Sequence, residues 1–140
     1  MVGVVLCGGQ SKRMGSDKGL MKQGNLTWTE VAVAKLRSLG IPVVVSVNRN
    51  QVASYSKIFS LNELIIDDEN ILVGGPLLGL MSVHGQFPGE DLFVIACDMI
   101  EMNTTLLEFL FDSHEKSAHG VYIYSAEETI QPLCGIYNSK

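Results

Sequence analysis

The residues best suited to chemistry gather near the N-terminus, in residues 6–18, which read Leu-Cys-Gly-Gly-Gln-Ser-Lys-Arg-Met-Gly-Ser-Asp-Lys. Glycines let backbone N–H groups surround an anion, and the cations Lys12, Arg13 and Lys18 can neutralise phosphate charge, arginine by a bidentate contact and lysine as a point charge. The segment is not a P-loop, because Gly15 is followed by Ser16 rather than by Lys and Ser/Thr, and it does not match G-x-G-x-x-G either. It predicts a phosphate site of another kind, and its alternative is a plain polar loop.

Three further polar residues follow apolar runs that are typical of strands. Asn48 follows Pro42–Val47, Asp67 follows Leu64–Ile66, and Asp98 follows Leu92–Cys97. A carboxylate at the end of a buried strand is costly unless it is paired, solvated or bound to a metal. The alternatives are ordinary ones: Asp98 could cap a helix, and Asn48 and Asp67 could be turn residues.

The elements that must position these residues alternate between buried strands and amphipathic helices. Apolar runs without alternation predict strands at Val2–Cys7, Pro42–Val47, Leu64–Ile66, Leu92–Ala96 and Val121–Tyr124. Helical spacing predicts helices at Thr29–Leu39 and Thr104–His114, with Asn103 or Thr104 as N-cap of the second and Gly40 as the C′ residue of the first. We therefore expect an α/β fold, Rossmann-like, with a three-layer, doubly wound, mostly parallel sheet, and ligands at the carboxyl ends of its strands.

Composition narrows the function classes. The 140 residues fit a single domain, and the net charge of −5 without a basic stripe argues against a nucleic-acid partner. No apolar stretch approaches a membrane span, and Val2–Cys7 is too short for a signal-peptide core. The three cysteines are far apart and the histidines lack ligand spacing, so we expect reduced thiols, no zinc site and a cytoplasmic protein.

Four segments, in order along the chain, carry a resemblance to a known family. The opening segment 6–18 resembles the signature of the molybdenum cofactor guanylyltransferases, with two glycines, an R-M-G and a D-K pair. Gly75-Pro76-Leu77-Leu78-Gly79 resembles that family's G-P-L-x-G, with Pro76 expected at the first position of a helix. Residues 96–99 resemble its C-D-x-P, although the family's proline is absent and Met99 and Ile100 stand in its place, and residues 131–137 resemble its P-L-x-G-x-Y.

The resemblance implies a site. It assigns Leu6, Cys7, Gly8 and Gly9 to contacts with the nucleotide and places Arg13 and Lys18 at the triphosphate as catalytic cations. Asp98 is implied as the catalytic carboxylate that binds Mg²⁺ and, with Lys18, also contacts the nucleotide. The counterparts of Asn48 and Asp67 contact the nucleotide, and a carboxylate at Asp67 suits the N1–H and N2–H₂ donors of guanine; Asp68 could serve instead.

The resemblance also implies the reaction: transfer of GMP from GTP to Mo-molybdopterin, with release of pyrophosphate. The Gly8-Gly9 pair favours GTP over CTP, because cytidylyl relatives tend to carry alanine before a single glycine. Cofactor-assembly proteins or a recipient molybdoenzyme are further implied partners. Relatives continue beyond the last element seen here, so we expect the chain to lack the family's C-terminal acceptor-side segment. The alternatives are a cytidylyl or sugar-phosphate nucleotidyltransferase of the same fold, or an inactive nucleotide-binding module.

Overall fold

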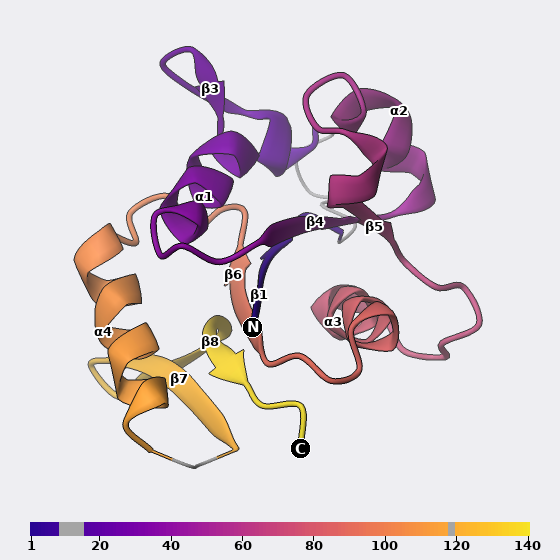
Figure 1. The fold of residues 1–140 in the computed structure, drawn as a ribbon. Coiled ribbons are helices and arrows are strands. Elements are labelled where there is room, and N and C mark those ends of the chain that lie inside the picture. Colours follow the sequence, from indigo (N-terminus) through magenta and orange to yellow (C-terminus); the bar gives the residue numbers. More distant parts are fainter. Residues whose placement is uncertain (9–15, 118–119) are drawn as a thin grey trace.

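The centre of the structure, a computed structural model that describes residues 1–8, 16–117 and 120–140, is a six-stranded sheet (Figure 1). Its order is β5-β4-β1-β6-β8-β7. The strands are β1 (Val2–Leu6), β4 (Val43–Val47), β5 (Leu64–Ile66), β6 (Leu92–Ala96), β7 (Val121–Ala126) and β8 (Thr129–Tyr137). Strands β5, β4, β1 and β6 are parallel, and β8 and β7 add two antiparallel strands at one edge.

Helices cover both faces of the sheet. Helices α1 (Trp28–Arg37) and α4 (Thr104–Glu115) pack on one face, and α3 (Gly75–Gln86) packs on the other (Figure 1). Each face has its own hydrophobic cluster, one around Leu36 and Leu107 and the other around Val4 and Val83. The expected α/β fold with a mostly parallel sheet in a three-layer arrangement is therefore confirmed.

Shorter elements surround this framework. A small hairpin is formed by β2 (Lys22–Gln23) and β3 (Leu26–Thr27). The chain also contains the four-residue helix α2 (Val52–Tyr55) and three 3₁₀ helices, η1 (Lys18–Leu20), η2 (Arg49–Gln51) and η3 (Leu61–Glu63). Two of these, η1 and η2, lie next to predicted site residues.

The local sequence explains where these elements begin. Every residue of β1, β4 and β6 is buried, which is why these strands read as continuous apolar runs. Thr27 and Glu30 form a reciprocal capping box at the start of α1. At the start of α4, Asn103 Oδ1 accepts a hydrogen bond of 2.9 Å from the Leu106 N–H, so Asn103 is the N-cap.

Pro76 lies at the start of α3, as expected, because Gly75 before it has a φ of 63° and is not yet helical. Two other features differ from the expectation. Strand β8 was not among the expected strands, and its Pro132 and Gly135 are typical of loops, yet it pairs with both β6 and β7. Gly40 has the left-handed φ of 78° expected after a helix, but it lies two residues beyond the cap Ser38 rather than one.

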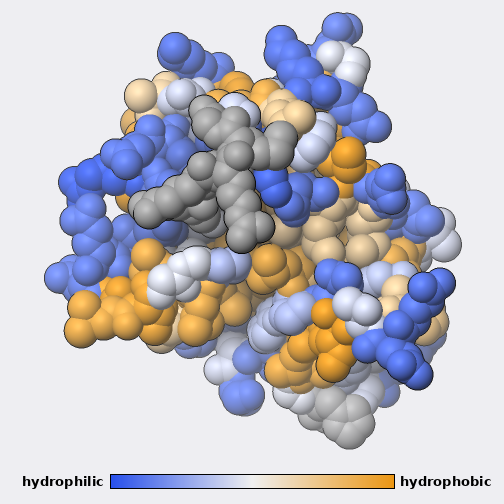
Figure 2. All heavy atoms as spheres, turned by 180° about the vertical axis from the view of Figure 1, so that it is seen from behind, coloured by the Kyte–Doolittle hydropathy of each residue, from blue (hydrophilic) through white to orange (hydrophobic). Residues whose placement is uncertain are grey.

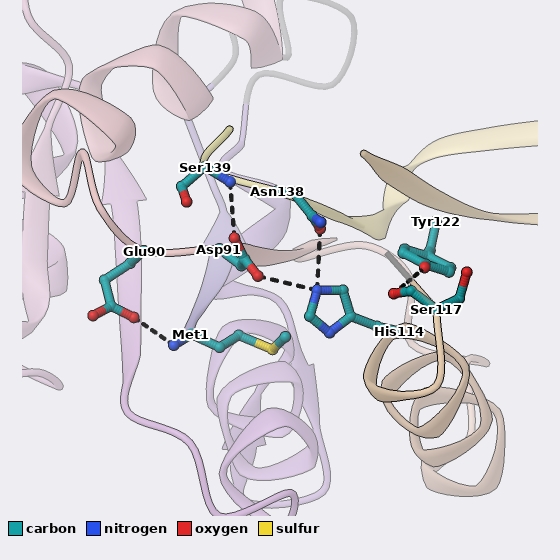
Figure 3. Close-up of polar contacts among 8 residues, drawn as sticks. All are labelled: Met1, Glu90, Asp91, His114, Ser117, Tyr122, Asn138 and Ser139. Carbon is teal, nitrogen blue, oxygen red and sulfur yellow. Dashed lines mark hydrogen bonds and ion pairs between the residues drawn. The ribbon is translucent and has the colours of Figure 1, made fainter. Parts of the chain in front are cut away.

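Polar contacts fix the end of β8 at the amino ends of the parallel strands (Figure 3). The imidazole Nε2 of His114 lies 3.0 Å from Asp91 Oδ2 and 3.0 Å from Asn138 Oδ1. The other Asp91 oxygen accepts a 2.8 Å hydrogen bond from the Ser139 N–H. Asp91 precedes β6, whereas Asp98 follows it. These contacts therefore lie at the amino ends of the parallel strands, opposite the carboxyl ends where Asp98 lies, and we interpret them as structural.

The sequence predicts reduced cysteine thiols and no membrane-spanning segment. Cys7, Cys97 and Cys134 are buried and have free thiols. Burial raises the pKa of Cys134 to about 11. None of the helices in the described residues combines the length and the hydrophobicity that a membrane crossing needs.

Candidate functional site

Predicted site residues lie at the carboxyl ends of the parallel strands, and we call this row of strand ends the carboxyl edge. In the order of the sheet they are Asp67 after β5, Asn48 after β4, Gly8 after β1 and Asp98 after β6. Neighbouring parallel strands lie about 4.8 Å apart, so the strand ends carrying Asp67 and Asp98 are about 14 Å apart. This is the edge at which open α/β sheets bind ligands.

Lys18 and Asp98 meet at one end of this edge. Lys18 Nζ lies 3.6 Å from Asp98 Oδ2, and the two side chains are 41% and 44% exposed. Lys18 begins η1, whose N-cap is Asp17. The turn after Asp98 is fixed in part by α1, because Lys35 Nζ donates a 2.7 Å hydrogen bond to the Ile100 carbonyl. The structure therefore brings together the two residues that the sequence places in separate motifs.

Asp67 lies at the other end, close to the small residues Gly8, Ser46 and Gly79. Its Oδ1 accepts a 3.4 Å hydrogen bond from Ser46 Oγ. A Cβ added to Gly8 would lie 2.9 Å from Asp67 Oδ2, and one added to Gly79 would lie 2.5 Å from Ser46 Oγ. Burial raises the pKa of Asp67, and the Ser46 hydrogen bond only partly opposes this. Neighbouring Asp68 instead accepts hydrogen bonds of 2.9 Å from the N–H and side-chain amide of Asn70, so Asp67 is the carboxylate beside Gly8.

The backbone of residues 6–8 is already part of the sheet. The N–H groups of Cys7 and Gly8 donate to the Ser46 carbonyl at 2.9 and 3.1 Å. The Leu6 carbonyl accepts from the Cys97 N–H at 3.1 Å, and the Cys7 carbonyl accepts from Gln51 Nε2 at 2.9 Å. A carbonyl oxygen has a second lone pair, so contacts of Leu6 and Cys7 with a nucleotide would use their carbonyls rather than the Cys7 N–H.

Asn48 has a structural role at this edge. Its Oδ1 accepts a 3.1 Å hydrogen bond from the Gln51 N–H, and its own N–H donates to Gln51 Oε1 at 2.9 Å. The two residues thus cap η2 reciprocally, as a turn-forming asparagine does. The cap uses the oxygen of the Asn48 amide, and its nitrogen is the group that a ligand would contact.

Two predicted site residues, Gly9 and Arg13, lie outside the described residues. Cys7, just before them, is 7% exposed, and its thiol lies 3.3 Å from Thr29 Oγ1. Burial, followed by the neighbouring Cys97, raises the pKa of Cys7 well above its usual value. A thiol held in its protonated form is a weak nucleophile, so we do not assign Cys7 as a nucleophile.

The carboxylates limit how a metal could be held. Among residues 1–8, 16–117 and 120–140, no three His, Cys, Asp or Glu side chains cluster as a metal site would require. Mg²⁺, however, keeps several waters and takes only one or two protein carboxylates beside phosphate oxygens. Asp98, 44% exposed and therefore open to water, fits that kind of binding.

Sequence reasoning missed two polar residues of the site, Asp17 and Ser46. Asp17 stands in the D-K pair but was given no role, and its carboxylate contacts Gly19, Gln51 and Tyr55. Ser46, the single polar residue in Val43–Val47, is fully buried and pairs with Asp67. A hydroxyl inside such a strand is the signal that could have identified it, because a buried polar group needs a partner.

Hydrophobic side chains are exposed beside the site. Seen from behind, the molecule carries a hydrophobic area over α3 and the loop before it (Figure 2). Leu72 is 96% exposed, Leu77 51% and Met81 43%. A separate cleft of about 610 Å³ lies between α1 and residues 58–63, away from every predicted site residue.

Comparisons with known proteins show relatives in sequence and in fold. A relative from Geobacillus sp. (strain WCH70), named "probable molybdenum cofactor guanylyltransferase", is 32% identical over 140 residues, which is 100% of this chain and 71% of the relative. The crystal structure of molybdopterin-guanine dinucleotide biosynthesis protein A from Archaeoglobus fulgidus matches with a TM-score of 0.77 at 23% identity, covering 99% of this chain and 68% of that one. A Mycobacterium tuberculosis protein crystallised in complex with manganese matches the fold with a TM-score of 0.67 at 11% identity, over 98% of this chain and 69% of that one.

The family model gives the assignment. The model of the MobA-like NTP transferase domain matches residues 3–140, which include both Lys18 and Asp98. The resemblance noted in the sequence is therefore confirmed by an alignment over nearly the whole chain. On this match and the 32% identity to a curated relative, the chain belongs to the MobA-like NTP transferase domain family.

Proposed function

We propose that this chain transfers GMP from GTP to Mo-molybdopterin, which forms the molybdopterin guanine dinucleotide cofactor and releases pyrophosphate. Family membership supplies the enzyme class, a nucleotidyltransferase. The names of the relatives support the choice of base and acceptor. The observation that carries the proposal is the 3.6 Å approach of Lys18 to Asp98 at the carboxyl edge, where a cation and a metal-binding carboxylate can act on the same phosphates.

The nucleotide would lie along the carboxyl edge of the sheet, with its base at Asp67 and its phosphates at Lys18. Guanine has N1–H and N2–H₂ donors on one edge, and a carboxylate can accept both. Asp67 is half-buried beside Gly8, which has no side chain that would crowd its carboxylate. Leu6, Cys7, Gly8, Gly9 and Asn48, which follow the strands between these ends, would contact the nucleoside.

Charge neutralisation would do most of the chemistry. The terminal phosphate of the pterin attacks the α-phosphorus of GTP, the bond to the β-phosphate breaks, and negative charge develops on the α-phosphate oxygens and on pyrophosphate. Cations held beside those oxygens stabilise the transition state more than the ground state. Lys18 would neutralise the triphosphate together with Arg13. A phosphate monoester is already largely ionised near neutral pH, so no protein base has to activate it.

Asp98 would hold a divalent ion, which we propose to be Mg²⁺. When bound there, such an ion would neutralise part of the charge on the phosphates. The manganese in a structural neighbour is consistent with a divalent ion in this fold. We further propose that residues 1–140 act as one nucleotide-binding domain in the cytoplasm, and that the product passes to cofactor-assembly proteins or a recipient molybdoenzyme.

Calorimetry with GTP, CTP, ATP, UTP and dTTP, each with and without Mg²⁺, tests the proposal. We expect selective binding of GTP that is tighter with Mg²⁺, and loss of that Mg²⁺ dependence in Asp98→Ala. Asp112→Ala is the matched control, because Asp112 is an exposed carboxylate on α4. Selective binding of CTP or dTTP would assign the chain to another branch of the fold, and binding of none of the five nucleotides would refute the site.

A further inference from the structure

The carboxylate of Asp17 has more polar contacts than a residue of a plain loop needs. Its Oδ1 accepts 3.0 Å hydrogen bonds from the Gly19 N–H and from the Tyr55 hydroxyl. Its Oδ2 accepts a 2.7 Å hydrogen bond from Gln51 Nε2. Three donors from two separate parts of the chain thus converge on the residue directly before Lys18.

Gln51 can serve Asp17 in only one orientation of its amide. The Asn48 N–H donates to Gln51 Oε1 at 2.9 Å, so the oxygen must face Asn48. Gln51 Nε2 donates to the Cys7 carbonyl at 2.9 Å, so the nitrogen must face Cys7 and Asp17. Gln51 therefore joins Cys7, at the end of β1, to Asp17, at the start of η1, and it requires an acceptor at position 17.

The turn that carries Lys18 fits closely against buried side chains. A Cβ added to Gly19 would lie 2.2 Å from Tyr55 Oη and 2.6 Å from Thr29 Oγ1. Thr29 Oγ1 also donates a 2.9 Å hydrogen bond to the Gly19 carbonyl. Tyr55 and Thr29 are fully buried. The backbone on the C-terminal side of Lys18 is thus fixed in place, and Asp17 fixes it on the other side.

We propose that Asp17 is a positioning residue that fixes the direction of the Lys18 side chain, so that its ammonium group lies beside Asp98. Gln51, in η2, is hydrogen-bonded both to Cys7 after β1 and to Asp17, and Asp17 directly precedes Lys18. That Lys18 then meets the triphosphate rests on the proposed function; its placement beside Asp98 does not. Asp17 itself touches no reacting atom in this account.

Asp17→Asn is the sharpest change, because it keeps the shape of the side chain. Asparagine can still accept from Gly19 and Tyr55 with its oxygen, but its amide nitrogen then faces Gln51 Nε2, and two donors cannot bond. Gln51→Ala removes the same link from the other side without altering residue 17. Asp112→Asn makes the same chemical change at an exposed carboxylate of α4 that is not a predicted site residue.

The first measurement needs no nucleotide. The lysines are reductively methylated with ¹³C-formaldehyde, and the Lys18 resonance is identified by its absence in Lys18→Ala. Asp98→Asn records how far this resonance moves when the partner carboxylate is neutralised. We expect Asp17→Asn and Gln51→Ala to move it in the same direction and Asp112→Asn to leave it in place. A Lys18 resonance that is unchanged in both Asp17→Asn and Gln51→Ala overturns the proposal.

The second measurement uses GTP and Mg²⁺. We expect Asp17→Asn to weaken GTP binding about tenfold or more, as misplaced contact groups do. In the Lys18→Ala background the same change should have no further effect, because Asp17 acts through Lys18. Independent, additive losses would mean that Asp17 has only a general structural role. If the Lys18 resonance moves as expected but wild-type protein binds no GTP, the proposed function fails and the positioning role stands.

Discussion

Lys18 Nζ and Asp98 Oδ2 lie 3.6 Å apart, although 80 positions separate the two residues in the chain. Each follows a different parallel strand, β1 and β6, and these strands are neighbours in the sheet. The pair joins two motifs that are separate in the sequence. Both side chains are more than a third exposed, so their mutual attraction is largely screened by water.

This exposure predicts that stability and activity separate at these two positions. An exposed ion pair contributes about 0–1 kcal/mol, so Lys18→Ala and Asp98→Ala should each change the free energy of unfolding by less than about 1 kcal/mol. We expect each to lower the rate of GMP transfer by about 100-fold or more, as removal of one charge-stabilising group does. Urea unfolding and pyrophosphate release measure the two effects.

Lys57→Ala, at an exposed lysine that is not a predicted site residue, is the control and should preserve both quantities. Normal turnover in Lys18→Ala would contradict the assigned role. A loss of several kcal/mol in either variant would instead make the pair structural.

Replacing the Asp67 carboxylate should have opposite effects on the free energy of unfolding and on GTP binding. Burial raises its pKa, so the folded protein keeps this proton to a higher pH than the unfolded chain does. As the pH rises between the two pKa values, the unfolded state loses its proton first, and the contribution of Asp67 to stability falls. Asp67→Asn removes this loss, so its free energy of unfolding at pH 7 should equal or exceed that of the wild type.

GTP affinity should change in the other direction. The ionised Asp67 carboxylate accepts from guanine in our proposal, so Asp67→Asn should weaken GTP binding by about tenfold, the effect of losing one hydrogen bond to a charged group. In the wild type, affinity should fall as the pH drops through the raised pKa of Asp67. Calorimetry across pH checks both effects, and unchanged GTP affinity in Asp67→Asn would remove this residue from the site.

Gly8→Ala should displace the Asp67 carboxylate without unfolding the chain. The new Cβ would lie 2.9 Å from Asp67 Oδ2, and a side-chain end can move away. We expect weaker GTP binding and a change in the free energy of unfolding below about 3 kcal/mol, the upper range for added core volume. Gly85→Ala is the matched control: it lies in α3 with no neighbour within 4 Å and should stabilise the helix by about 0.5–1 kcal/mol. Equal GTP affinity in the two variants would count against the close approach of Gly8 to Asp67.

The contacts of Asp91, at the amino ends of the parallel strands, should affect stability and not GTP binding. Burial tends to raise the pKa of Asp91, but the hydrogen bond from the Ser139 N–H and the neighbouring His114 outweigh it and hold this pKa below its usual value. A lowered folded-state pKa gives stability above the unfolded pKa that is lost as the pH falls through the folded one. Asp91→Asn should therefore lower the free energy of unfolding by about 1–3 kcal/mol at pH 7 and make stability less dependent on acid pH. Denaturation across pH tests this. A changed GTP affinity in Asp91→Asn would contradict a purely structural role of the Asp91 contacts.

The parallel half of the sheet could be predicted from the sequence because burial on both faces leaves a simple pattern. The apolar runs at Leu64–Ile66 and Leu92–Ala96 match β5 and β6. The antiparallel edge could not be predicted in the same way. Strand β8 is inserted between β6 and β7, an order that no local pattern encodes, and its Pro132 and Gly135 are typical of loops.

The site was predictable in part for a related reason. Asp67 and Asp98 are charged residues that follow apolar runs, and Lys18 stands in a segment rich in glycines and cations; both patterns show in a single sequence. The roles of Asp17 and Gln51 depend on hydrogen bonds between positions 34 residues apart. Their partners become visible only when η1 and η2 lie side by side, so the sequence alone offered no reason to pair them.

Transfer of the labelled GMP group is the decisive measurement. The chain is incubated with [α-³²P]GTP or [α-³²P]CTP, Mg²⁺ and Mo-molybdopterin, and the products are separated and identified by mass. We expect a labelled dinucleotide from GTP, formed together with an equal amount of pyrophosphate, no labelled dinucleotide from CTP, and a rate that collapses in Lys18→Ala. Tight GTP binding without any transfer of label to molybdopterin would refute the proposed reaction and make this chain a nucleotide-binding module.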